Sequence, residues 1–159
     1  MNLSNLFKAL FFVLAGIIGY LALTPDADLA DAARPGLLDD VARTALFGVT
    51  IAPDLVTHFF AFAALGAVLP LARINVLSSP IIAFIALYAF GYALEYGQGE
   101  WNMRSNDLRD LWANALGAAV GLGIGYFFET VRRRIERLAR SLRPSRLDAS
   151  LPGALSRLP

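Results

Sequence analysis

Four continuously apolar segments dominate the sequence, over residues 6–23, 55–72, 76–94 and 111–128. A transmembrane helix needs about 20 mostly apolar residues, with roughly 17 as the lower limit. The chain has 57% hydrophobic and 17% charged residues, whereas a soluble domain has roughly 45–50% and about 25%. A membrane β-barrel would need strands of alternating hydrophobicity, which these segments lack. The sequence therefore predicts an all-α, polytopic membrane protein with four transmembrane helices, residues 1–128 forming one membrane domain.

The first segment permits a second interpretation, a cleaved signal peptide. Its uninterrupted apolar stretch, from Ala9 to Leu23, is at the upper limit for that role, and Lys8 is the only basic side chain before it. We expect a retained span, and cleavage stays open. In both cases the chain after Leu23 emerges on the outer side of the membrane.

The basic residues predict the orientation of the chain. The net charge of +1 separates into −4 over the first 128 residues and +5 in the tail that follows. Lysine and arginine near the ends of spans mark the cytoplasmic side, and Lys8, Arg73 and the run Arg132–Arg134 all indicate the same side. We therefore expect a multi-pass membrane protein with both termini cytoplasmic and residues 24–54 and 95–110 outside.

The tail carries its own pattern. Val131, Ile135, Leu138 and Leu142 recur at helical spacing between arginines, which is typical of an amphipathic helix on an anionic membrane surface. We expect a basic amphipathic cytoplasmic helix over 129–146 and a disordered tail over 147–159. Basic residues beside a span do not by themselves indicate a nucleic-acid partner, and none is expected.

The rarest residue types exclude several chemistries. The chain has no cysteine and one histidine, so disulfides, thiolate metal sites and multi-histidine zinc sites are excluded. No G-x-S-x-G motif supplies a nucleophile. We expect no cofactor and no resident metal. A cation site of Asp54, Glu95 and Asp110 nevertheless stays open, because hard cations bind oxygen ligands.

The polar residues outside the tail gather at the outer ends of spans two to four. Ionisable groups at such positions are costly and often functional. Residues four apart share a helix face, as Asp54 and His58 do, and as Asp110 and Asn114 do. The predicted site consists of His58, Glu95 and Asp110 as candidate catalytic residues and Asp54, Gln98, Arg104, Asp107 and Asn114 as candidate ligand-binding residues.

Each of these residues also has a structural interpretation. Asp107 or Asp110 can cap the start of span four, since acids favour helix N-termini. Asn114 can be a hydrogen-bonding tie between helices, and Glu95 and Arg104 can form one ion pair. A small four-helix protein needs fewer polar ties than this set offers, so we favour a functional site.

Gly117, Gly121 and Gly125 lie four apart and form a stripe that lets another helix approach closely. We expect this stripe to pack inside the bundle, with Gly66 and Gly91 as matching contacts. A homo-oligomer through the same stripe is the lesser alternative.

The order of these polar residues resembles the VanZ-like family of bacterial integral membrane proteins. The resemblance covers roughly residues 53–125. It rests on Asp54, His58, Phe59 and Leu65-Gly66, on Glu95-Tyr96-Gly97-Gln98, and on Arg104, Asp107, Asp110, Asn114, Gly117 and Gly121. Thr24-Pro25 after the first span also fits the family. The chain has Leu55 where members often have lysine and Phe62 where tyrosine is frequent.

The resemblance implies a small protein of the bacterial cell envelope, located in the plasma (inner) membrane. The family's name member is associated with resistance to the glycopeptide teicoplanin. Three functions fit the predicted site. The first is binding of membrane lipids, in particular the head group of a lipid-linked envelope precursor or glycolipid, with Arg104 pairing with an anion. The second is a membrane-embedded acid/base hydrolase or transferase with His58 as proton carrier. The third is a structural or assembly subunit.

Overall fold

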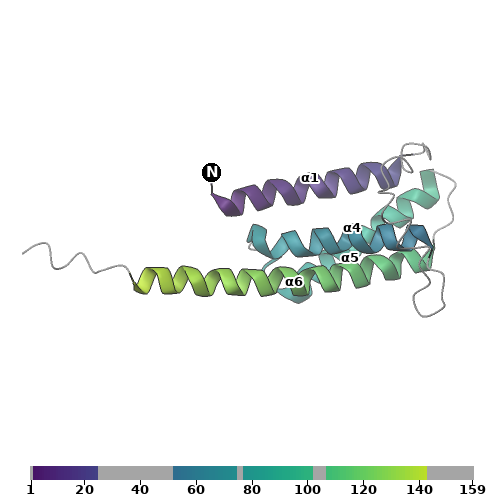
Figure 1. Ribbon diagram of the computed structural model, residues 1–159. Coiled ribbons are helices and arrows are strands. Elements are labelled where there is room, and N and C mark those ends of the chain that lie inside the picture. Colours follow the sequence, from purple (N-terminus) through teal and green to yellow (C-terminus); the bar gives the residue numbers. More distant parts are fainter. Residues whose placement is uncertain (1, 25–51, 75–76, 102–106, 143–159) are drawn as a thin grey trace, which may run out of the picture. The chain divides into compact units, whose positions relative to one another are not determined.

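The computed structural model describes residues 2–24, 52–74, 77–101 and 107–142. Within these ranges the chain forms the helices α1 (Leu3–Leu23), α4 (Pro53–Ala72), α5 (Pro80–Trp101) and α6 (Leu108–Ser141), and no strand (Figure 1). All four helices are long and apolar enough to cross a membrane. The all-α fold predicted from the sequence is confirmed, and the helices are compatible with a multi-pass membrane protein.

The third helix differs from the predicted span at both ends. It begins at Pro80 instead of residue 76, where the ring fixes φ and no backbone N–H is needed. It continues to Trp101 instead of ending at residue 94. Gly97 and Gly99 weaken a helix in water, but in apolar surroundings the backbone must satisfy its own hydrogen bonds. Glu95 and Gln98 therefore lie inside α5.

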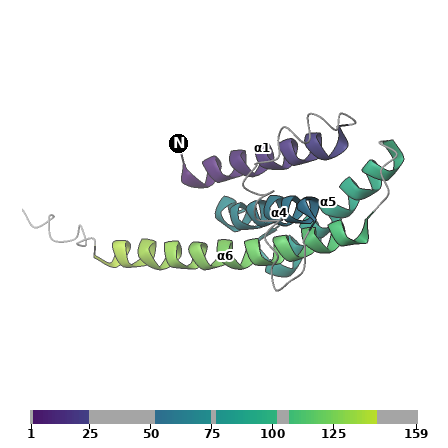
Figure 2. The ribbon, with the colours of Figure 1, turned by 45° about the vertical axis from the view of Figure 1, so that its right-hand side comes forward.

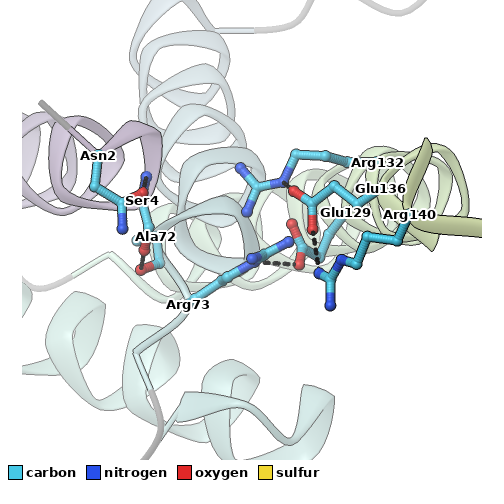
Figure 3. A network of polar contacts seen from close by, with 8 residues as sticks. All are labelled: Asn2, Ser4, Ala72, Arg73, Glu129, Arg132, Glu136 and Arg140. Carbon is cyan, nitrogen blue, oxygen red and sulfur yellow. Dashed lines mark hydrogen bonds and ion pairs between the residues drawn. The ribbon is translucent and has the colours of Figure 1, made fainter. Parts of the chain in front are cut away.

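The fourth helix also runs further than expected. The sequence suggested a separate basic helix over 129–146, but α6 is one helix of 34 residues that ends at Ser141. No glycine or proline interrupts residues 126–141, so nothing breaks the helix there. The chain divides into two compact units after Glu129. In the second unit Glu136 lies 3.6 Å from Arg132 and 3.8 Å from Arg140 (Figure 3). Residues 147–159 lie outside the described ranges.

The first unit exposes many apolar side chains and buries several polar ones. Its exposed side chains include Ile81, Trp112 and Phe127, which are 72%, 69% and 64% exposed. Its buried residues include Glu95, Gln98, Asp110, Asn114 and Glu129, beside a core of Phe62, Leu65, Leu69, Leu87 and Leu122. This distribution suits a bundle surrounded by lipid, where charged groups turn inward and apolar ones face outward.

The glycine stripe of α6 faces α4 of the same chain. Gly117 lies against the Phe59 carbonyl, Gly121 against Ala63 and Gly125 against Ala67. From the other side, Gly66 of α4 meets the backbone of α6 at Ala118 and Leu122. The expected packing inside the bundle is thus present, and this face is filled by α4. α1 packs along α4 and α5 (Figure 2).

One end of the first unit is held by a partly buried ion pair that was not predicted from the sequence. α4 ends at Arg73, whose backbone is left-handed (φ 53°, ψ 47°). Its Nε donates to Glu129 Oε1 of α6 at 2.7 Å, and the Ser4 hydroxyl of α1 donates to the Ala72 carbonyl at 2.8 Å (Figure 3). The predicted topology contained a signal for the pair, because it places Arg73 and Glu129 at the same end of their spans.

Candidate functional site

The polar residues predicted as a site lie at the opposite end, where α1 and α5 end and α4 and α6 begin. This end is on the right of Figure 1. Gln98 of α5 donates from its amide to the Ala22 carbonyl of α1 at 3.0 Å. His58 of α4 lies beside Asp110 of α6. His58 is five residues into its helix, which corresponds to about 7–8 Å of rise, so the site is near the helix ends and not at mid-bundle.

His58 lies between two side chains of α6. Its Nδ1 is 3.1 Å from Asn114 Oδ1, and its Nε2 is 3.4 Å from Asp110 Oδ2. Asp110 and Asn114 are one turn apart and therefore share a face of α6. The imidazole thus bridges this face, with each ring nitrogen directed to a different polar group.

Glu95 of α5 completes the group from a third helix. Glu95, His58 and Asp110 each offer one nitrogen or oxygen atom, and these atoms all lie within 4.8 Å of one another. Glu95 is 6% exposed, Asp110 7% and Asn114 1%. The structure therefore brings together the three residues proposed as catalytic and adds Asn114. We refer to His58, Glu95, Asp110 and Asn114 as the polar cluster.

The two carboxylates of the polar cluster lie close enough to repel each other when both are ionised. Two ionised carboxylates up to about 4.8 Å apart repel by at least roughly 3 kcal/mol at an effective dielectric constant near 20. A shared proton, a protonated imidazole or a bound cation removes this repulsion. The cluster can accordingly transfer a proton, accept hydrogen bonds from a ligand or bind a metal ion.

The remaining predicted site residues have other positions. Asp107 is exposed and caps α6, because its Oδ1 accepts from the Arg109 N–H at 2.9 Å. Asp54 lies in the first turn of α4, one turn before His58, but is not a member of the group with ligand atoms within 4.8 Å. Arg104 lies outside the described residues.

The sequence anticipated the capping role of Asp107 as an alternative to ligand binding.

Gln98 acts as a tie between α5 and α1 through its bond to Ala22. A pocket of about 410 Å³ adjoins this tie and is lined mainly by apolar groups of Leu23, Phe90, Ala93, Leu94, Tyr96 and Gly97. No member of the polar cluster lines this pocket.

Comparisons with models of protein families, with curated proteins and with solved structures give no match for this chain. The resemblance to the VanZ-like family rests on the residues given above.

Proposed function

We propose that the chain is a VanZ-like integral membrane protein of a bacterial cell envelope, and that its polar cluster binds the head group of a lipid-linked precursor or glycolipid. The observation that carries this proposal is the convergence of His58, Glu95, Asp110 and Asn114 at one end of the bundle. A relation to glycopeptide resistance, as for the family's name member, is part of the same proposal.

The charge distribution supports an outward-facing site. Lys8 lies near the start of α1 and Arg73 at the end of α4, and the bond from Ser4 to Ala72 joins these two ends. Basic residues favour the cytoplasmic side, whereas the polar cluster lies at the other end of the helices. With this orientation the cluster lies near the outer leaflet, where lipid-linked precursors and glycolipids present their head groups.

Access to the cluster supports binding of a polar group. The His58 side chain is 18% exposed and that of Asp110 9%, so His58 is the more accessible of the pair. A head group that reaches His58 would lose hydrogen bonds to water. It would gain hydrogen bonds to the polar cluster, where the imidazole lies between a carboxylate and an amide. Such charge-assisted bonds are stronger than neutral ones.

The pair of His58 and Asp110 favours acid/base catalysis as the second candidate function. A carboxylate beside one ring nitrogen and an amide beside the other orient an imidazole for proton transfer. On this alternative the protein is a hydrolase or transferase for an envelope lipid. Replacement of His58 by Gln would then abolish turnover while leaving the bound lipid in place.

The test of the binding proposal is mass spectrometry of lipids that remain on the full-length protein after gentle detergent extraction. We expect one lipid class with a glycosyl head group to be enriched over the bulk membrane. His58→Phe should lose this enrichment. Ser4→Ala is the matched control, because it removes a polar side chain at the opposite end of the bundle.

The proposal is refuted if the lipids bound to the wild type match those of the bulk membrane, or if His58→Phe retains the same enrichment as Ser4→Ala. Thermal unfolding of each variant is measured alongside. If His58→Phe unfolds well below the control, Asn114→Leu takes its place, since it removes the amide next to His58 and keeps the same branching of the side chain.

A further inference from the structure

We infer that His58, Glu95 and Asp110 form a binding site for one divalent transition-metal ion such as Zn²⁺. This inference does not depend on the lipid proposal. From the sequence alone we expect no resident metal, and only a carboxylate site of Asp54, Glu95 and Asp110 stays open. The structure replaces Asp54 by His58 in that set, because His58, Glu95 and Asp110 are the residues whose ligand atoms converge.

The hydrogen bond between His58 and Asn114 supports a metal ligand at the other ring nitrogen. With the amide oxygen toward the ring, Nδ1 carries the proton and donates to Asn114 Oδ1 at 3.1 Å. The lone pair of Nε2 then points toward Asp110 Oδ2, and two acceptors facing each other repel unless a cation lies between them. Metal-binding histidines generally donate their second N–H to a carbonyl or carboxylate in this way.

The separation of the two atoms fits joint coordination better than a hydrogen bond. His58 Nε2 and Asp110 Oδ2 are 3.4 Å apart, beyond the usual N–H···O range of about 2.7–3.2 Å. A tetrahedral zinc ion with bonds of about 2.0–2.1 Å holds its ligand atoms roughly 3.3–3.4 Å apart. The distance between these two atoms therefore fits two ligands of one ion as well as an ion pair of a protonated imidazole. Since the three ligand atoms span up to 4.8 Å, the side chains would have to draw together around the ion.

Charge and ligand type select the ion. One neutral imidazole and two carboxylates carry a charge that a divalent cation neutralises, which removes the repulsion between Glu95 and Asp110 inside an apolar bundle. A nitrogen ligand favours transition ions over Mg²⁺ and Ca²⁺, which prefer oxygen. Three protein ligands leave a fourth position for water or a ligand oxygen.

Asn114 supplies a second, independent observation. It is 1% exposed, and its Nδ2 is buried with no hydrogen-bond partner in the described part of the chain. If the amide is turned around, Oδ1 becomes the end without a partner. Buried amides normally have both ends satisfied, so an unpartnered nitrogen on the side chain that contacts His58 indicates that the polar cluster is incomplete without a further group. This nitrogen lies beside Gly91 of α5, where an added Cβ would be 3.2 Å away.

The test is zinc binding by the full-length protein in detergent, without a polyhistidine tag and after treatment with a chelator. Zn²⁺ alone is titrated by equilibrium dialysis with elemental analysis, in the presence of excess Mg²⁺. We expect about one equivalent of zinc per chain, with release of protons on binding. Co²⁺ in place of Zn²⁺ should give the visible absorption bands of a low-coordinate site.

Asp110→Asn and Glu95→Gln should each reduce zinc affinity by 100-fold or more. Glu129→Gln is the matched control, because it neutralises a buried carboxylate at the other end of the bundle. Asn114→Ala should lower affinity by about 10- to 100-fold and leave the stoichiometry unchanged, since it removes the partner that orients the imidazole.

The inference is overturned if the wild type binds no zinc in the micromolar range, which would leave a protonated imidazole as the compensating charge. It is equally overturned if Asp110→Asn binds zinc as tightly as Glu129→Gln. A zinc site without enriched lipid would refute only the lipid proposal, and enriched lipid without zinc would refute only this one.

Discussion

Replacing Gly66 by Ala should force α4 and α6 apart. A Cβ at this position would lie 2.7 Å from the Ala118 carbonyl oxygen and 2.8 Å from the Leu122 nitrogen. Both neighbours are backbone atoms of a helix, so no side chain can turn aside to make room. Ordinary van der Waals contact begins at 3.4 Å, about 0.7 Å further out. The helices must therefore separate by about this distance along the line where they meet.

The size of the effect follows from the lost contacts. A gap of about 0.5–1 Å forfeits roughly a quarter to a half of the attraction of each atom pair, and overpacked sites in well-packed interiors typically cost about 1–3 kcal/mol. Gly66→Ala should thus lower the free energy of unfolding by that amount, roughly a 5- to 150-fold change in the unfolding equilibrium.

The assay is unfolding by SDS in mixed micelles, followed by circular dichroism. Gly123→Ala is the matched control, because nothing lies within 4 Å of a Cβ added there and alanine favours a helix more than glycine does. We expect Gly123→Ala to be neutral or stabilising. Equal stability of the two variants would refute the close approach of α4 and α6 at Gly66.

Three further predictions concern the two ends of the bundle. Gln98→Ala should lower the free energy of unfolding by about 1 kcal/mol, because it removes the hydrogen bond to the Ala22 carbonyl. An unchanged midpoint of unfolding by SDS would show that this hydrogen bond does not stabilise the fold. Glu129→Gln should lower the free energy of unfolding by about 1–3 kcal/mol. A double-mutant cycle with Arg73→Gln should show a coupling energy above about 0.5 kcal/mol. Additive effects of the two substitutions would show that the ion pair of Arg73 and Glu129 does not stabilise the protein. Alkaline phosphatase fused after Thr24 should be active, and fused to the C-terminus inactive; the reverse pattern would invert the proposed orientation.

The number and kind of helices could be predicted from the sequence because the transmembrane signal is strong. Four apolar stretches of about spanning length exclude most alternatives. The residues at which the helices end were predicted less accurately than their number. Glu95 and Gln98 mark the end of the apolar run, but α5 continues to Trp101 because a helix in apolar surroundings loses its backbone hydrogen bonds if it stops early. The charged residue Glu95 thus set the end of the predicted span, although the helix itself continues beyond it.

Whether a predicted site residue contacts His58 depends on the helix face that its side chain occupies. Asp110 and Asn114 are one turn apart, and both meet His58. Asp107 lies on the same face by spacing, yet it precedes the helix and caps it.

Spacing within one segment predicts a shared face, but only packing decides which face of a neighbouring helix lies opposite. Gly117 and Gly121 set that packing, because they allow α6 to approach Phe59 and Ala63 of α4 closely. The contact at Phe59 is next to His58 along α4, and the contact at Ala63 is about one turn further on. Together they bring Asn114 within hydrogen-bond distance of the imidazole. The glycine stripe and the polar cluster are therefore parts of one arrangement, and a change that separates α4 from α6 should weaken zinc binding as well as stability.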